Sequence, residues 1–343
     1  MNRLYINLLL ITLLSAGLSL EAHWVSMFHK KLTEDDLQAA VNNTLVFTKA
    51  DVPEFSQLMF SWNAMRPQKG FFTFFVQVRN SLTKKWSTWH RMIDWGAGVQ
   101  RSYESKGDSF SQYVHVRLEM KRYLADAFRI KIIAHHQASL DLLKGFAVTI
   151  SNKNAFKPEL LSKDIELLPS VTVKNVPRIS QFALNHPDSG RICSPTSCTM
   201  LMRYLTGCVI DPIDFAEKSF DHGLGAYGSW PFNMAHAFEE SEGKNWFFNT
   251  RLNSFLELHA QLSRNIPVVV SVRGSMAGAP RPYPKGHLLI VVGWDAKTQQ
   301  VICHDPASET DHHTLQRYKF RDFVRAWELS HRLVYWVEPI EIA

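Results

Sequence analysis

The stretch CSPTSCTMLMRYLTG, residues 193–207, sets the fold that we expect for the second half of the chain. Its apolar residues recur with the spacing of one helix face, at Cys198, Leu201, Met202 and Leu205. Ser194-Pro195 suits the cap and first position of a helix and Gly207 suits its end, so we predict a helix over Ser194–Leu205. Cys193 therefore lies at the N-terminal end of this predicted helix.

Strands follow helices in the rest of this half. We predict two more helices, at Pro231–Glu240 and Asn253–Asn265. The strands predicted after them are Val268–Val272, His287–Trp294, Gln300–His304 and Arg332–Val337. Helices followed by antiparallel strands indicate an α+β domain, which we expect over residues 176–340.

The first half is rich in Val, Ile, Phe, Tyr and Trp, and its only helix pattern is a short one at Glu34–Asn42. The predicted strands are Leu45–Phe47, Leu58–Trp62, Phe71–Val78, Trp86–Trp95, Tyr113–Leu118, Phe128–Ile133 and Gly145–Ile150. Short strands separated by turns indicate an all-β sandwich domain over residues 44–150. Residues 151–175, punctuated by Lys and Pro, are predicted to link the two domains.

Composition and charge narrow the class of protein. The 343 residues are 45% hydrophobic and 20% charged, which is typical of globular chains and long enough for two domains. The net charge of +6 is spread along the chain and forms no basic cluster. We therefore expect no nucleic-acid partner.

The first residues resemble an export signal. Asn2 and Arg3 precede the apolar run Leu8–Leu18, which is too short to span a bilayer comfortably. We predict a signal peptide over residues 1–22 and a secreted or periplasmic protein. Cleavage after Gly17 and an uncleaved anchor remain as alternatives. No later segment is long and apolar enough to be a stable membrane span after signal removal.

The chain has four cysteines, too few for a disulfide framework and without the spacing of a zinc site. The unpaired N–H groups and the dipole at a helix N-terminus lower a thiol pKa, and only Cys193 has that position. Cys198 is expected in the core, Cys208 follows the helix end, and Cys303 lies in a strand. A Cys208–Cys303 bridge remains open. A cysteine before a helix is also common in proteins where it does no chemistry.

His287 and Asp305 are the candidates for a general base and for the acid that orients it. His287 opens an apolar strand at the sheet edge, where a cleft can reach it, although a solvated strand end is the alternative. If the following hairpin is centred on Lys297, His287 lies opposite Ala307. Asp305 is then on the same face, at a diagonal backbone distance of about 7–8 Å. A turn with an even number of residues would move Asp305 to the other face, and Asp305 could merely end its strand.

An oxyanion would need hydrogen-bond donors. The backbone N–H of Cys193 is one candidate, and a Gln or Asn side chain upstream is the usual type of second donor. Gln181 is our choice, and Asn185 is its rival.

Five segments in this order resemble the peptidase-like family related to bacteriocin-processing cysteine peptidases, whose fold is papain-like. They are Val176–Gln181, Cys193–Ser197, Tyr227–Asn233, Gly286–Asp295 and Asp305–Ala307. The resemblance implies that Cys193 is the nucleophile, His287 the base, Asp305 the orienting acid and Gln181 the oxyanion glutamine. Ser194 stands where many members have glycine. Phe60–Ala64, Trp86–Trp89 and Trp95-Gly96 resemble the β-rich domain found upstream in some members.

These observations predict an exported cysteine peptidase that hydrolyses peptide bonds through a thioester acyl-enzyme, without metal or organic cofactor. Its partner would be a peptide or protein substrate, with cell-wall peptide included. A peptidoglycan amide hydrolase or acyltransferase with the same Cys-His dyad is one alternative. A catalytically inactive peptide-binding protein is another.

Three weaker patterns have simpler interpretations. Gly223–Gly228 fits GxGxxG, but no strand precedes it, so we expect a flexible loop along the cleft. A group rich in His and Asp is expected to be a solvated turn rather than a metal site: His304, Asp305, Asp311, His312 and His313. The tryptophans Trp86, Trp89 and Trp95 are expected in a core, with a sugar- or peptide-binding stripe as the alternative.

Overall fold

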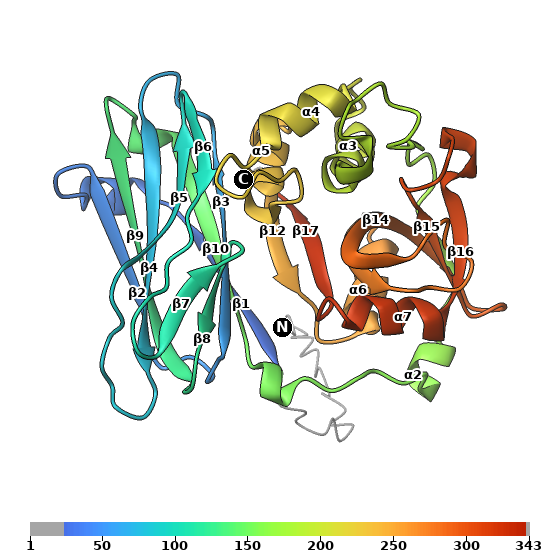
Figure 1. The fold of residues 1–343 in the computed structure, drawn as a ribbon, viewed down its shortest axis with the longest axis horizontal. Helices are drawn as coiled ribbons and strands as arrows, with labels where there is room; N and C mark the ends of the chain where they lie inside the picture. The colour runs from blue at the N-terminus through green and yellow to red at the C-terminus, as the bar shows by residue number, and fades with distance from the viewer. Residues whose placement is uncertain (1–23, 341–343) are drawn as a thin grey trace, which may run out of the picture.

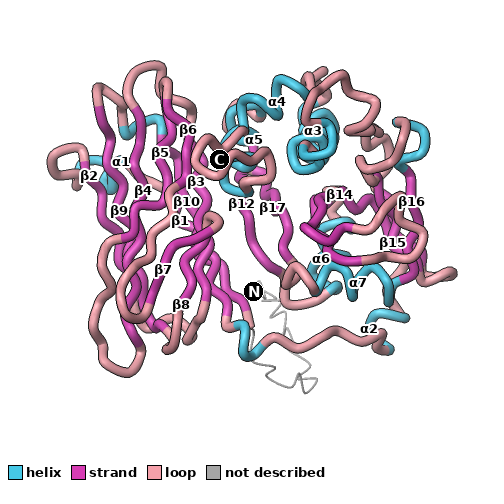
Figure 2. The backbone as a smooth tube through the Cα atoms, viewed as in Figure 1, coloured by secondary structure: helices cyan, strands magenta, loops and turns pink. Residues whose placement is uncertain are grey.

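The computed structural model describes residues 24–340, so the predicted signal peptide lies outside the described residues. Three antiparallel sheets form this part of the chain, and most of its helices belong to the second half (Figures 1 and 2). Within residues 24–340, none of the helices has the length and apolar character needed to cross a membrane.

The first half contains two five-stranded sheets. In spatial order, one consists of β1 (Val25–Lys31), β10 (Leu143–Ser151), β3 (Gln57–Ala64), β8 (Arg117–Met120) and β7 (Ser111–Val114). The other consists of β2 (Thr44–Lys49), β9 (Ala125–His135), β4 (Phe71–Asn80), β5 (His90–Gly96) and β6 (Val99–Ser102). The short helix α1 (Glu34–Gln38) lies between β1 and β2 in sequence. Strand β1 therefore extends this half ahead of residue 44.

Side chains from both sheets form one hydrophobic core. In β9, Ile130 and Ile132 are buried while the alternate residues Arg129 and Lys131 are not, as expected of a strand with one face on a core. The rings of Phe60 in β3 and Phe74 in β4 lie 5.2 Å apart between centroids, across the two sheets.

The second half is built on a third, seven-stranded sheet. Its main path is β12 (Asn245–Arg251), β17 (Leu333–Pro339), β13 (Val268–Gly274), β14 (Tyr283–Asp295), β15 (Gln300–His304) and β16 (Leu315–Lys319), with β11 (Val171–Thr172) paired to β14. The helices are α2 (Lys163–Glu166), α3 (Cys193–Thr206), α4 (Pro212–Ser219), α5 (Trp230–Glu240), α6 (Phe255–Ser263) and α7 (Phe320–Glu328). In Figure 1, α3 and α4 lie above this sheet and α6 and α7 below it.

The two halves share packing and hydrogen bonds. Asn63, buried in β3, accepts a hydrogen bond from the Phe247 N–H (2.9 Å) and donates one to the Phe247 carbonyl (3.0 Å) in β12. The ring of Phe232 in α5 meets Trp62 edge-on, with centroids 5.6 Å apart, and belongs to the core of the first half. The α+β part is thus fastened to a β-sheet of the first half.

Candidate active site

Helix α3 begins at Cys193 itself, one residue before the predicted start. Its preceding residue is Ile192, and no side chain within residues 24–340 caps this end. Gly207 ends the helix in the left-handed conformation, with φ of 70°, as predicted. The prediction that Ser194 caps the helix was wrong. The buried Ser194 hydroxyl instead lies 2.7 Å from the Tyr335 hydroxyl, directed into the core.

Cys193 is partly exposed, and its electrostatic environment differs from those of the buried Cys198 and Cys303. Burial alone would raise its pKa, but the hydrogen bond and charge of His287 and the N–H groups of Leu288 and Ser194 bring the pKa below its ordinary value. Burial raises the pKa of Cys198 and Cys303 well above normal.

All four cysteines lie within residues 24–340 and all are free. The Cys208–Cys303 bridge is therefore not formed.

His287 does not open its strand as predicted. Strand β14 starts at Tyr283, which pairs with Gly274, and His287 pairs with Val272; between these two pairs β14 contains the extra residues of a bulge. The strand continues upstream because Tyr283 is buried and finds this backbone partner. His287 is consequently a buried residue inside the strand, 4% exposed, rather than a solvated strand end.

The register between β14 and β15 contains a compensating bulge. Asp295 pairs with Gln300, so the turn between them has an even number of residues, which by itself would turn Asp305 away from His287. Between the pairs Val291–Cys303 and Gly293–Ile302 an extra residue, Val292, shifts the register by one. Beyond this bulge the pairing has the predicted register, and Asp305 faces His287.

The carboxylate of Asp305 is fully buried and accepts four hydrogen bonds. Its Oδ1 lies 2.7 Å from His287 Nε2 and accepts from the Ala307 N–H at 2.9 Å. Its Oδ2 accepts from the hydroxyls of Tyr283 (2.6 Å) and Tyr318 (2.8 Å).

The two buried groups hold each other in charged form. Burial would raise the pKa of Asp305, but the charge and hydrogen bond of His287, with the Tyr283 hydroxyl and the Ala307 N–H, lower it. Burial would lower the pKa of His287, but Asp305, joined by Cys193, raises it to about 10. Since Asp305 occupies Nε2, Nδ1 is the ring nitrogen left for the sulfur of Cys193.

Tyr283 and Tyr318 were missed by the sequence reasoning. Tyr283 also stacks on His287, with centroids 4.1 Å apart and planes 15° from parallel. It lies four residues before His287, so both side chains share one face of β14. A strand predicted from residue 283 would have revealed this pairing. Tyr318 comes from β16, which was not predicted.

Gln181 forms hydrogen bonds with the loop that follows Asp305 and with the segment before α3, and not with Cys193. Its backbone N–H donates to the Pro306 carbonyl (2.9 Å), and its side-chain Nε2 donates to the Ser189 carbonyl (2.7 Å) just before α3. One hydrogen of that amide is left for another acceptor. Asn185, the rival, is exposed.

The His- and Asp-rich segment, residues 304–313, forms hydrogen bonds with residues 177–180, which precede Gln181. His304 Nδ1 lies 3.1 Å from the Pro177 carbonyl, and Asp311 accepts from the Ser180 N–H at 2.7 Å. The Ser180 hydroxyl donates to the Ser308 carbonyl at 2.5 Å. Within the described residues, no three His, Cys, Asp or Glu side chains are grouped as metal ligands.

The Gly223–Gly228 loop is held at its start by Asp221, whose carboxylate accepts a hydrogen bond from the Gly223 N–H at 2.8 Å. The buried Asp221 carboxylate accepts from the N–H (2.8 Å) and hydroxyl (2.6 Å) of Ser102 in β6, and from the Ser229 hydroxyl (2.9 Å). Tyr227, from the same loop, packs with Ile192 immediately before Cys193. The first half is thereby joined to the wall beside the nucleophile candidate.

The three tryptophans of the first half divide between core and surface. Trp95 is fully buried, as expected, and meets Trp62 edge-on. Trp86 and Trp89 are partly exposed on the outer face of their sheet, beneath the cations of Arg129 (3.9 Å) and Lys131 (4.5 Å).

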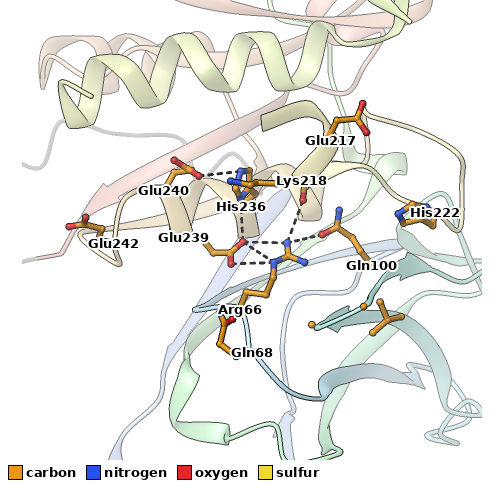
Figure 3. Close-up of a pocket in the computed structure, with 13 residues that line it drawn as sticks. Arg66, Gln68, Gln100, Glu217, Lys218, His222, His236, Glu239, Glu240 and Glu242 are labelled. Carbon is orange, nitrogen blue, oxygen red and sulfur yellow. Dashed lines mark hydrogen bonds and ion pairs between the residues drawn. The ribbon is translucent and has the colours of Figure 1, made fainter. Parts of the chain in front are cut away.

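A pocket of about 670 Å³ lies between the two halves, away from these residues (Figure 3). Arg66 enters it from the first half and hydrogen-bonds Glu239 (3.3 Å) of α5 and Gln100 (2.7 Å) of β6. None of Cys193, His287 and Asp305 lines this pocket.

The arrangement of Cys193, His287 and Asp305 is of the kind that nucleophilic catalysis by cysteine requires. Residues 173–335, just under half of the chain, match the model of the Peptidase_C39 like family. The match contains Cys193, Gln181, His287 and Asp305, and it confirms the family resemblance noted in the sequence.

Two solved structures show a weaker likeness. A putative C39-like peptidase from Bacillus anthracis is 16% identical, with 50% of this chain and 100% of that chain covered and a TM-score of 0.38. Xylellain, a cysteine protease from Xylella fastidiosa, is 11% identical, with 54% and 91% covered and a TM-score of 0.31. No curated protein matches the chain.

Proposed function

We propose that the protein is an exported cysteine peptidase, with Cys193 as nucleophile and His287 as its acid–base partner. The observation that carries the proposal is the chain of contacts from the buried Asp305 through His287 to a thiol at the open end of α3. The raised pKa of His287 and the lowered pKa of Cys193 favour a thiolate–imidazolium pair at neutral pH.

In the proposed reaction, the Cys193 thiolate attacks the carbonyl carbon of a peptide bond. The Cys193 N–H and the remaining N–H of the Gln181 amide stabilise the oxyanion. His287 gives its proton to the leaving amine, and a thioester remains on Cys193. Water, deprotonated by His287, then attacks the thioester and releases the acid, while Asp305 orients the imidazole throughout. The inward position of the Ser194 side chain is compatible with an unobstructed thiol.

The proposal extends to location, organisation and substrate. We place the protein outside the cytoplasm, secreted or periplasmic, with residues 1–22 as signal peptide. We divide the mature chain into a β-sandwich domain, predicted at 44–150 and extended upstream by β1, a linker at 151–175 and a papain-like peptidase domain at 176–340. The substrate is a peptide or protein, with cell-wall peptides included.

The test is a comparison of wild type with Cys193→Ala on a diverse peptide library and on cell-wall fragments, read by mass spectrometry. Wild type is expected to produce new peptide termini that Cys193→Ala does not. Cys208→Ser, which removes an exposed thiol just after the C-terminal end of α3, is the matched control and should retain full activity. Equal cleavage by wild type and Cys193→Ala would contradict the proposal.

A further inference from the structure

Two tyrosine hydroxyls converge on one oxygen of Asp305, and the reaction above makes no use of them. Tyr283 comes from β14 and Tyr318 from β16, on opposite sides of β15, which leads into Asp305. Both donate to Oδ2, at 2.6 and 2.8 Å, so Oδ1 is left for His287 and the Ala307 N–H. All four contacts are buried.

We propose that Tyr283 and Tyr318 are positioning residues that keep Asp305 ionised and aimed at His287, and that they thereby govern the charge on Cys193. The inference rests on the proposed roles of Cys193, His287 and Asp305. A carboxylate without solvent would take up a proton, and hydrogen bonds to its charged form oppose this. With Asp305 ionised, His287 retains its proton, and the thiolate of Cys193 is stabilised in turn.

The two tyrosines remain donors over the working pH range. Burial first, and then the negative charge of Asp305, raises the pKa of Tyr283 and of Tyr318 far above ordinary values. The other titratable groups that act on the pair are Arg281 and Cys193 near Tyr283, and the buried Cys303 near Tyr318. Neither hydroxyl can therefore exchange its proton with Asp305 near neutral pH.

Tyr283 also stacks on the imidazole of His287, a contact that Tyr318 does not make. Its ring lies parallel to the imidazole of His287 at 4.1 Å and fixes the plane of that ring. Tyr283→Phe removes only the hydrogen bond, whereas Tyr283→Leu removes the stacking as well. Tyr318→Phe removes a hydrogen bond without touching His287. These three variants separate the control of charge from the control of ring orientation.

The test is the pH dependence of Cys193 alkylation by iodoacetamide, in a Cys208→Ser background so that the exposed thiol does not interfere. Each Phe variant is expected to move the alkylation midpoint to higher pH, and the double variant by about one pH unit or more, because His287 is less charged. Tyr283→Leu should show the shift of Tyr283→Phe and also a lower maximal hydrolytic rate.

The control is Tyr204→Phe, which removes a hydroxyl bonded to the Asn265 carbonyl and should leave the midpoint unchanged. Unchanged midpoints in both Tyr318→Phe and the double variant, with native circular dichroism, would overturn the inference. If Tyr283→Phe does not fold, Tyr318→Phe alone decides.

Alkylation requires no peptide substrate, so this result is independent of the peptidase test. Shifted midpoints in a protein that cleaves no peptide would support the tyrosine assignment and reject the proposed hydrolysis. Cleavage that depends on Cys193, with midpoints that do not move, would support the peptidase and reject the assignment.

Discussion

At the scale of single residues, the charge of Asp305 influences the protonation of His287, and the charge of His287 influences the protonation of Cys193. Asp305 has no contact with solvent, so only hydrogen-bond donors of the protein stabilise its negative charge. Among these donors, His287 is the group that carries a positive charge. His287 in turn faces the thiol that lies at the end of α3. Removal of any one of these groups is therefore expected to change the protonation of the next.

The first prediction concerns the pH profile of hydrolysis. The lowered pKa of Cys193 sets the acid limb of kcat/KM below the ordinary range of thiols, and His287, with a pKa of about 10, sets the alkaline limb. Activity is lost on the alkaline side because His287 then lacks the proton for the leaving amine. Initial rates between pH 5 and about 10.5 measure both limbs.

Asp305→Asn provides the comparison for this profile. Without the negative charge, the pKa of His287 falls, so the alkaline limb should move to lower pH and kcat/KM should drop by about 10²-fold or more. An alkaline limb that stays in place in Asp305→Asn would contradict the coupling.

The second prediction concerns the selectivity of thiol modification. At pH 6, iodoacetamide should label Cys193 first, since its thiolate is stabilised while Cys198 and Cys303 are buried with raised pKa values. Peptide mapping by mass spectrometry gives the rate at each position, with the exposed Cys208 as internal reference. Equal rates at Cys193 and Cys208 would show that the environment of Cys193 does not activate it.

At the scale of secondary-structure elements, helix α3 was easier to predict from the sequence than the strands around it. The helix after Cys193 follows from a local pattern of apolar residues, and local patterns are readable. The face of Asp305 was predicted through a hairpin centred on Lys297, whereas the real turn is even and Val292 bulges. That bulge is covered by β11, where the Val173 N–H donates to the Val292 carbonyl (2.8 Å), a contact between residues far apart in sequence.

The unpredicted elements have a similar physical origin. Strand β12 is buried along nearly its whole length, including Asn249 and Arg251, so it lacks the alternation that marks a half-exposed strand. Two of its polar residues contact the first half: the Thr250 hydroxyl accepts from the Thr149 hydroxyl at 2.9 Å, and Arg251 donates to Gln57 at 2.7 Å. Such pairing depends on a distant segment and leaves no local signal.

The third prediction tests the bulge. A Cβ on Gly293 would lie 2.6 Å from the Val171 carbonyl oxygen and 3.2 Å from Ile302, so Gly293→Val should displace β11 and disturb the register toward Asp305. We expect a loss of about 2 kcal/mol in the free energy of unfolding, together with reduced activity. Urea denaturation and initial rates measure the two effects.

Gly228→Ala is the matched control, because a Cβ there meets no atom within 4 Å among the described residues. It should change the free energy of unfolding little. Equal stability of Gly293→Val and Gly228→Ala would argue against the role given to the bulge.

At the scale of the whole molecule, the two halves behave as one packed unit. Phe232 and Ala235 of α5 lie in the core of the first half, and Asn63 binds the backbone of β12. The buried guanidinium of Arg251 also spans the contact, and burial lowers its pKa to about 9. Such a polar and apolar contact couples the stability of one half to that of the other.

The fourth prediction follows from the buried Asn63. Asn63→Leu leaves the N–H and carbonyl of Phe247 without their partners, so the free energy of unfolding should fall by about 2–4 kcal/mol. Unfolding in urea, followed by tryptophan fluorescence and circular dichroism, should remain a single transition in wild type. Asn154→Ala, at an exposed position, is the control and should be neutral.

The hydrogen bonds of the Asp221 carboxylate predict what happens when the first half of the chain is removed. Two of its donors, the amide and hydroxyl of Ser102, belong to a strand more than a hundred residues upstream. A fragment starting at residue 173 would keep the cysteine, histidine and aspartate of the reaction. In that fragment the Asp221 carboxylate would keep its donors from Gly223, Leu224 and Ser229 and lose the two from Ser102, next to the loop that borders Cys193. The first half of the chain thus contributes directly to the conformation of the loop beside Cys193.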